Sequence, residues 1–118
     1  MADDQTYVYR LAQLTEWRAA QESGEIPLRD IDRVDEYFHL STRAQLLETA
    51  RLHFADANDL VALAIEAAAL GDQLKFEWAQ KRGEAFPHYY GALHVKQVRR
   101  VIALVKTKTG FEFGGDLR

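Results

Sequence analysis

The sequence predicts an α+β fold: a single compact domain over residues 1–118, with a mixed or antiparallel sheet of five to six short strands and two main helices. Stretches rich in aromatic and β-branched residues recur along the chain, and two others carry apolar residues at helical spacing. The two kinds of stretch do not alternate with the period of βαβ units, which argues against a doubly wound sheet. The length of 118 residues also matches one domain.

The beginning of the chain predicts a strand followed by a helix. Residues 6–11 are rich in aromatic and β-branched side chains, as in a strand. Thr15 is the expected N-cap of a helix that ends near Gly24, because glycine readily adopts the left-handed conformation found after a helix. Residues 25–36 contain seven charged side chains, so we expect a surface loop or a frayed helix there.

A second strand and helix are predicted next. Residues 37–41 are short and mostly apolar, which favours a strand. Thr42 and Gln45 have the spacing of a capping box, in which each side chain binds the other residue's backbone N–H. Apolar residues at helical spacing extend this helix to about Phe54.

The rest of the chain is dominated by expected strands. The continuous apolar run at 60–65 predicts a central strand that is buried on both faces. Three further strands are expected at 74–78, at 99–105 and, as a short edge strand, at 110–115. Residues 86–91 are expected to form a rigid aromatic loop, because Pro87 lacks the N–H that a central strand needs.

Composition excludes several functional classes. The net charge of −3 argues against nucleic-acid binding. The chain has no cysteine, and its four histidines lack metal-ligand spacing, so we expect no disulfide and no metal. No apolar run approaches the ~20 residues of a membrane span, and residues 1–4 lack the basic start of a signal peptide. We therefore expect a cytoplasmic protein without membrane contact.

The C-terminal residues form a segment with a net positive charge on an otherwise acidic chain. The segment after Leu93 has a net charge of +4, against −7 for the segment that ends there. Such asymmetry marks either an anion-binding face or solvated strand ends. On the first interpretation, Lys96, Arg99 and Arg100 are expected at the rim of a binding cleft, where they would attract a pyrophosphate.

The first candidate site surrounds His39. Its imidazole is followed by the hydroxyls of Ser41 and Thr42 and by the N-terminus of the helix, and these groups could hold ribose hydroxyls or a phosphate. The alternative is that Thr42 caps the helix and His39 is a hydrogen-bonded core residue.

The second candidate site is the aromatic segment 86–91. Tyr89 and Tyr90 could stack a planar ring, and His88 could donate to a carbonyl or phosphate; alternatively, these side chains fill the core. Glu77 lies between two aromatic residues, where burial would raise the pKa of its carboxyl toward the range of a general base. The alternative for Glu77 is a solvent-exposed side chain. We expect His39, Thr42, His88 and Tyr90 to line one cleft.

These motifs, in this order, resemble the bacterial and plant family known as domain of unknown function 952. The matching segments are 39–42, Gln45, 74–77 and 86–91, and the resemblance extends from Tyr9 to the strand near Val101. The resemblance implies a compact fold similar to that of the ADP-ribosyltransferase superfamily. In two respects the sequence departs from the family pattern: Tyr37 replaces a usual glycine, and Phe38 a usual isoleucine.

The same resemblance implies NAD as a cofactor. His39 matches the histidine that holds the nicotinamide ribose in those transferases, and Gln45 matches a polar residue on the following helix, while Ser41 and Thr42 match the intervening hydroxyls. Tyr89 or Tyr90 would stack nicotinamide, and Glu77 or His88 would assist an acceptor. Glu77 precedes the tyrosines, however, whereas the catalytic glutamate of the transferases follows theirs.

Two functions are therefore expected as alternatives. The first is a domain that binds NAD or a related nucleotide, with ADP-ribosyl transfer as its possible reaction. The second is a non-enzymatic module with the same fold that binds a small ligand or a protein.

Overall fold

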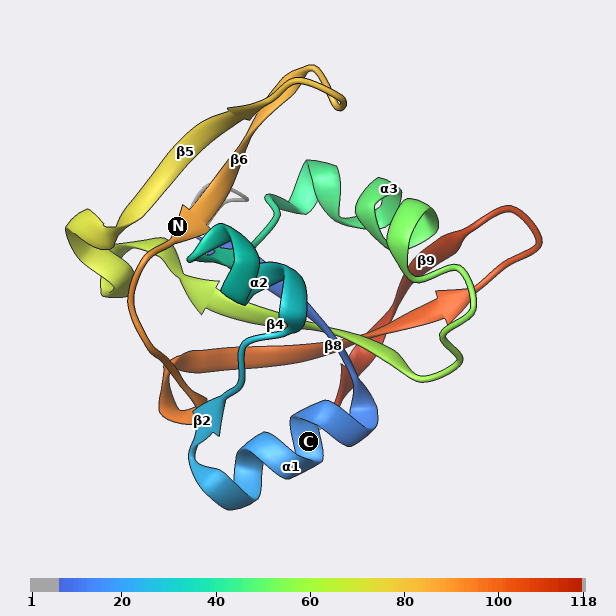
Figure 1. Cartoon of the computed structure of the whole chain (residues 1–118). Helices are drawn as coiled ribbons and strands as arrows, with labels where there is room; N and C mark the ends of the chain where they lie inside the picture. The colour runs from blue at the N-terminus through green and yellow to red at the C-terminus, as the bar shows by residue number, and fades with distance from the viewer. Residues whose placement is uncertain (1–6, 118) are drawn as a thin grey trace.

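A four-stranded antiparallel sheet forms the largest element of the computed structural model, which describes residues 7–117 (Figure 1). Its strands lie in the order β1 (Tyr7–Gln13), β4 (Leu60–Glu66), β8 (Val98–Lys106) and β9 (Phe111–Leu117). The predictions of strands at 60–65, 99–105 and 110–115 are thus confirmed, and residues 7–11 of the predicted 6–11 strand lie in β1. Thr6 and residues 1–4 lie outside the described residues.

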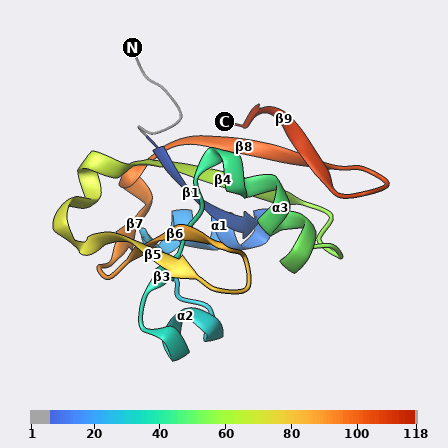
Figure 2. The same ribbon diagram turned by 90° about the horizontal axis from the view of Figure 1, so that it is seen from above.

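A smaller sheet lies across one face of the first (Figure 2). It contains, in order, β3 (Phe38–His39), β6 (Glu84–Tyr89) and β5 (Leu74–Ala79), all antiparallel. The two sheets are joined where Tyr9 and Ser41 exchange backbone hydrogen bonds of 2.8 and 2.9 Å. A third pair connects β2 (Glu25–Ile26) with β7 (Leu93–His94).

Three α-helices and two 3₁₀ turns complete the described chain. Helices α1 (Leu14–Ser23) and α3 (Arg43–His53) pack on β1, and α2 (Asp30–Asp35) lies beyond the smaller sheet (Figure 2). The 3₁₀ turns are η1 (Ala67–Gln73) and η2 (Val95–Gln97). No helix within residues 7–117 is long and apolar enough to cross a membrane.

The helix ends follow local sequence signals. The capping box is confirmed at α3: the Thr42 hydroxyl accepts from the Gln45 N–H at 3.3 Å, and the Gln45 amide oxygen accepts from the Thr42 N–H at 3.0 Å. Gly24 ends α1 with a φ of 88°, as predicted. The N-cap of α1 is Gln13 instead of Thr15, because Glu16 reaches back to the Gln13 N–H at 2.8 Å.

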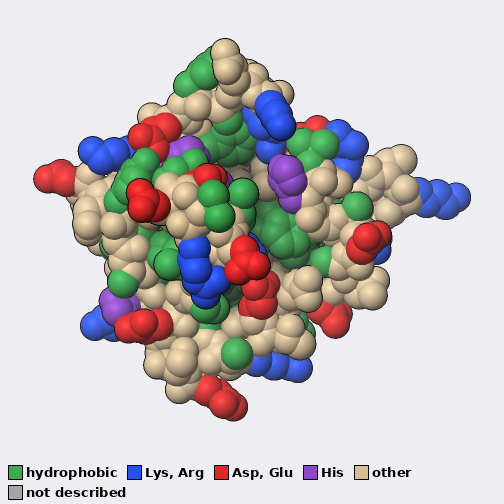
Figure 3. Space-filling model, viewed as in Figure 1, with side chains coloured by type: hydrophobic (Ala, Val, Ile, Leu, Met, Phe, Trp, Pro, Cys, Tyr) green, Lys and Arg blue, Asp and Glu red, His purple; other side chains and the backbone are tan. Residues whose placement is uncertain are grey.

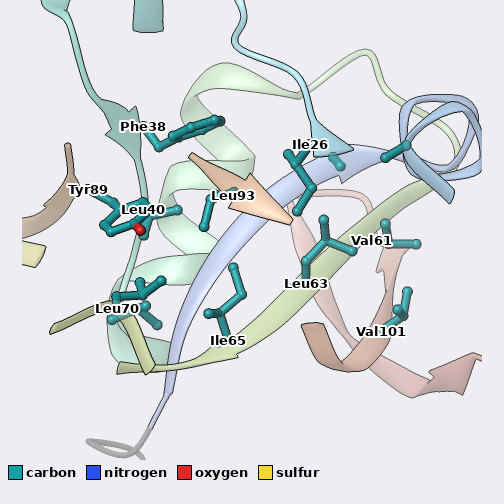
Figure 4. Packing of buried hydrophobic residues seen from close by; sticks show 13 residues of the cluster. Ile26, Phe38, Leu40, Val61, Leu63, Ile65, Leu70, Tyr89, Leu93 and Val101 are labelled. Carbon is teal, nitrogen blue, oxygen red and sulfur yellow. The ribbon is translucent and has the colours of Figure 1, made fainter. Parts of the chain in front are cut away.

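The hydrophobic core lies on both faces of β4. Val61, Leu63 and Ile65 point into the cluster shown in Figure 4, between the two sheets. Their alternating neighbours, Leu60, Ala62 and Ala64, point into a second cluster with residues of α3, including Leu46 and Ala50. This alternation confirms the prediction that the apolar run is a strand buried on both faces.

The described chain contains more elements than the sequence predicted, with nine strands and three α-helices in place of five to six strands and two helices. The segment 25–36, predicted as a loop or frayed helix, forms β2 and the short α2. Two-residue strands such as β2, β3 and β7 depend on their partners for their hydrogen bonds, so they leave little local pattern in the sequence.

Pro87 lies in the central strand of the smaller sheet, so the prediction of a loop at 86–91 is wrong for most of that segment. The Pro87 carbonyl accepts from the Leu40 N–H at 3.1 Å, which places the nitrogen of Pro87 on the same side. Strand β3 has already ended at His39 on that side. Leu40 lies opposite Pro87, so the missing N–H removes only the return hydrogen bond to the Leu40 carbonyl, just past the end of β3.

A buried ion pair connects the main sheet to α2. The Arg10 guanidinium on β1 contacts both carboxylate oxygens of Asp32, at 2.6 and 3.1 Å, and the two side chains are 1% and 0% exposed. Asp32 also accepts from the Arg29 N–H at 2.7 Å, which caps α2, and from the His39 N–H at 3.1 Å, at β3. One carboxylate thus fixes three elements to each other.

We expect Asp32→Ala to lower the free energy of unfolding by about 3–5 kcal/mol, because it leaves the Arg10 charge buried without its partner. Urea denaturation would measure the loss. The matched control is Asp30→Ala on the same helix, which removes a fully exposed carboxylate paired with Arg33 and should leave the stability nearly unchanged. Equal effects of the two substitutions would contradict the structural role of Asp32.

Candidate functional site

A cleft of about 650 Å³ lies between the smaller sheet, α2 and α3. Most of the surface area of its lining is apolar, which is typical of small-molecule sites, and its volume falls in their usual range. The apolar lining includes Leu11, Ile31, Leu40, Phe54, Trp78 and Phe86. The polar lining includes Arg29, Asp32, Tyr37, His39, Ser41, Thr49, His53, Arg82 and His88. Figure 3 shows hydrophobic side chains among histidine and charged side chains on the face of the molecule that is drawn in Figure 1.

His88 and Glu77 form a hydrogen-bonded pair beside this cleft. The two residues lie on the neighbouring strands β6 and β5, and Nδ1 of His88 is 2.8 Å from Oε1 of Glu77. A carboxylate can only accept, so Nδ1 carries a proton. Within residues 7–117, Nε2 of His88 takes part in no hydrogen bond. The neutral ring therefore has Nε2 as a free acceptor.

Tyr37 covers this imidazole. Its ring stacks on His88 with a centroid distance of 3.9 Å and an angle of 20°, and it also contacts His39 at 4.6 Å and Tyr90 at 5.3 Å. Burial and the nearby charges of Asp35 and Glu77 raise the pKa of Tyr37, so its hydroxyl stays protonated. Sequence reasoning missed Tyr37 as a site residue; its only signal was that it departs from the family pattern.

His39 lies opposite His88 on β3, with a distance of 5.7 Å between the ring centroids. Both of its ring nitrogens face carboxylates: Nδ1 is 2.7 Å from Asp32, and Nε2 is 2.9 Å from Asp35. Both contacts are hydrogen bonds only when both nitrogens carry a proton. The imidazole of His39 is therefore engaged by the protein itself, unlike that of His88.

Asp32 stays ionised in this arrangement. Burial by itself would raise the pKa of Asp32, but hydrogen bonds from His39 and Arg10, and the charge of Arg10, outweigh it and hold the pKa well below its usual range. The ionised carboxylate fixes the orientation of the His39 ring at the wall of the cleft.

The other residues expected around His39 occupy different places. Ser41 lines the cleft, and its hydroxyl lies 3.4 Å from that of Thr49 on α3. Thr42 caps α3 and is not part of the lining. The Gln45 amide nitrogen donates to the Ala85 carbonyl at 2.7 Å and to Glu84 at 3.1 Å, so Gln45 fastens α3 to β6 beneath the cleft.

The two tyrosines of the aromatic segment point in different directions. Tyr89 is buried in the core beside Phe38, at a centroid distance of 6.5 Å. Tyr90 is 40% exposed and lines a separate hollow of about 520 Å³ together with Tyr37 and Gly91. The expected single cleft thus contains His39 and His88 but not Thr42 or Tyr90.

Glu77 is not a buried base. Its side chain is 40% exposed, and hydrogen bonds from Tyr90, at 2.6 Å, and from His88 lower the pKa of its carboxyl. The prediction that burial raises this pKa is therefore wrong, because strand alternation turns Glu77 toward two donors at the sheet surface. Glu77 is absent from the cleft lining and contacts it through His88.

The C-terminal basic residues lie away from the cleft. Arg99 pairs with Glu66 at 3.2 Å and Arg100 with Asp116 at 2.9 Å, both on the main sheet, and Lys96 lines a different hollow. The cleft is instead lined by two arginines that sequence reasoning did not select, Arg29 and Arg82. The prediction that the basic C-terminal segment forms the rim is wrong, since β8 runs on the far side of β4 from β1 and the smaller sheet.

Comparison with known proteins places the chain in a family. The family model described as protein of unknown function (DUF952) matches residues 11–101, and the chain belongs to this family. No curated protein matches the chain. The crystal structure of protein CC0527 from Caulobacter crescentus is 37% identical, covers 90% of this chain and 92% of that chain, and has a TM-score of 0.82. Its solution NMR structure is 38% identical, covers 90% of both chains and has a TM-score of 0.77.

The hydrogen bond between Tyr90 and Glu77 predicts a shifted titration. This bond raises the pKa of Tyr90 to about 12 from its ordinary value of 10.0. In Glu77→Gln the charged acceptor is lost, so the pKa of Tyr90 should return toward the ordinary value, measured by NMR of the Tyr90 ring. The control is Glu84→Gln, which removes a carboxylate bound to Gln45 and should not change the titration. An unshifted Tyr90 in the wild type would contradict this geometry.

Asp32 predicts how stability depends on pH. In the unfolded chain its pKa is about 3.9, and in the folded protein it is lower, so the unfolded state binds the proton first as the pH falls. The stability due to ionised Asp32 is complete above the unfolded pKa and is lost as the pH falls below it, toward the folded pKa. Urea titrations should show a steeper decline below about pH 4 for the wild type than for Asp32→Asn. Parallel curves would contradict the assignment.

Proposed function

We propose that this member of the DUF952 family binds NAD or a related nucleotide in the cleft, with His88 as the residue that meets a ligand hydroxyl. The observation that carries the proposal is the free Nε2 of His88, whose ring is oriented by Glu77 and covered by Tyr37. A ribose hydroxyl can donate to this nitrogen. The largely apolar walls suit a planar base, and aromatic side chains such as Phe54 and Trp78 offer faces for stacking.

The role proposed for His39 follows from its two carboxylate partners. A ribose hydroxyl would contact its Nε2 only in exchange for Asp35, since that nitrogen already lies 2.9 Å from the Asp35 carboxylate. Asp35 is on the short helix α2 and its side chain is 35% exposed, so the exchange leaves no buried carboxylate unpaired. We therefore assign the first ligand contact to His88 and a secondary contact to His39.

The chemistry that the site supports best is proton transfer at His88. Glu77 would act as a positioning residue, because it reaches the cleft through the imidazole. ADP-ribosyl transfer would also need a carboxylate at the ribose to stabilise positive charge at its reacting carbon. The carboxylate in the lining is Asp32, whose oxygens are already bound by Arg10, Arg29 and His39. We therefore propose nucleotide binding, whereas ADP-ribosyl transfer would require in addition a free carboxylate at the ribose.

A second candidate function is a protein-interaction module. Phe76 and Trp78 lie on the edge strand β5 and are 55% and 66% exposed. An edge strand with exposed aromatic residues can pair with a strand of another protein. In this alternative the cleft has no nucleotide to bind.

The test is a titration of isotope-labelled protein with NAD, ADP-ribose and AMP. We expect NMR shifts at Ser41, Tyr37 and His88, and chromatography of NAD incubated with the protein would detect any released nicotinamide. His88→Ala should weaken binding about threefold to tenfold, as expected for one lost hydrogen bond.

The matched control is His94→Ala, because His94 lies on β7 outside the cleft lining and should not affect the affinity. Absence of shifts with all three nucleotides would reject the nucleotide proposal and favour the interaction module. Shifts confined to Phe76, which lies outside the cleft lining, would also reject binding in the cleft.

A further inference from the structure

We propose that Arg82 is the anion subsite of the cleft and binds the phosphate of a nucleoside monophosphate, or the corresponding phosphate of a larger nucleotide. This inference rests on the proposed nucleotide binding and adds the group that recognises the phosphate. Arg82 takes the phosphate-binding role that the sequence predicted for the basic C-terminal segment, because the arginines of that segment are paired on the main sheet.

The guanidinium of Arg82 is held in place without a direct ion pair in residues 7–117, and Glu48 acts on it only as a nearby charge. Arg82 lies in the turn between β5 and β6, and its guanidinium carbon is 4.6 Å from the centre of the Phe86 ring. Nη1 donates to the Thr49 hydroxyl at 3.0 Å. Nη2 is buried and has no hydrogen-bond partner, and Arg82 forms no ion pair within the described residues.

A buried donor without a partner is an unusual feature, because most such groups are hydrogen-bonded in folded proteins. An acceptor that reached Nη2 would remove this penalty, and an anion would also pair with the charge. The side chain is half-buried on a turn, so rotation about its own bonds can bring Nη2 to the cleft surface.

Arg29, the other arginine of the cleft, provides the contrast. Its guanidinium donates twice to Glu16, at 3.0 Å in each case, and also to the Leu11 carbonyl. Its charge is therefore matched by a carboxylate, and its Nη2 is satisfied. Of the two cleft arginines, Arg82 is the one that can bind an anion without breaking an existing ion pair.

The position of Arg82 relative to His88 indicates the size of the ligand. Phe86, whose ring lies against the Arg82 guanidinium, is two residues from His88 on β6. The two side chains therefore point to the same face of the strand. Two strand residues span about 7 Å. A phosphate at Arg82 and a hydroxyl at Nε2 of His88 thus fit on one ribose phosphate, which is the unit shared by AMP and NAD.

The experiment compares AMP with adenosine, which differ by the phosphate, in the wild type and in Arg82→Gln. In the wild type, AMP should bind about 10-fold to 150-fold more tightly, as expected for hydrogen bonds to a charged group. Arg82→Gln should reduce the affinity for AMP to nearly that for adenosine and leave adenosine unchanged. Arg99→Gln is the matched control, because Arg99 is paired with Glu66 on the main sheet and lies outside the lining.

The outcomes separate this inference from the proposed function. If adenosine and AMP bind the wild type equally, or if Arg82→Gln weakens both to the same extent, the Arg82 subsite is wrong and nucleotide binding stands. If neither of these ligands binds and NAD and ADP-ribose do not bind either, the proposed function fails, and inorganic phosphate then serves as the probe. Phosphate-dependent NMR shifts at the Arg82 Nε–H would support an anion site alone, and their absence would overturn it.

A second measurement distinguishes recognition from a structural role. Arg82→Gln should lower the melting temperature of the ligand-free protein only slightly, because it removes one hydrogen bond to Thr49 and the contact with the Phe86 ring from a half-buried side chain, while Nη2 satisfies no group in the fold. Arg82→Lys should keep part of the preference for AMP, since it retains the charge but loses the paired donors of the guanidinium. A large fall in melting temperature for both variants, with an unchanged preference for AMP, would show that Arg82 is structural.

Discussion

The carboxylate of Asp32 holds the wall of the cleft in place. It accepts five hydrogen bonds, two from Arg10, two from His39 and one from the backbone of Arg29. These donors come from β1, β3 and the start of α2, so one buried charge fixes the main sheet, the smaller sheet and the helix relative to each other. A buried charge is costly unless its partners are in place, which makes this arrangement specific as well as stabilising. The shape of the cleft therefore depends on the buried hydrogen bonds of Asp32.

The opposite wall depends on a different set of contacts. Gln45 at the start of α3 donates to the Ala85 carbonyl and to Glu84, and so holds the helix against β6. Arg82 at the end of the same hairpin reaches Thr49 on α3 and rests on Phe86. The hairpin of β5 and β6 thus meets α3 through polar side chains, while its other face packs Tyr89 into the core. The hairpin is therefore fixed to α3 by hydrogen bonds and to the core by apolar packing.

Local patterns predicted the parts of the fold that depend on local physics. The apolar run of β4, the capping box of Thr42 and Gln45, and the end of α1 at Gly24 each follow from the chain's own periodicity or backbone preference. His39 at the cleft wall could also be predicted from the sequence, because a polar ring in an apolar strand is unusual. The role of Asp32 was not, since seven charges in residues 25–36 have the composition of a surface segment. Its burial is set by Arg10, which is 22 positions away in the sequence. Tyr37 and Arg82 were missed for the same reason: their partners are distant in the sequence.

The two histidines on opposite strands show how similar side chains acquire different chemistry. His39 has a carboxylate close to each ring nitrogen, so both nitrogens are engaged by acidic residues of the protein itself. His88 has a carboxylate on one nitrogen only, and Tyr37 covers its face. A ring whose one nitrogen is held by a carboxylate and whose other is free can accept a proton and return it, because the carboxylate stabilises the imidazolium that forms. A ring held on both sides has no such freedom. The asymmetry of their partners, more than either residue's position in the sequence, leaves one ring nitrogen of His88 free for a ligand and makes His39 part of the frame around it.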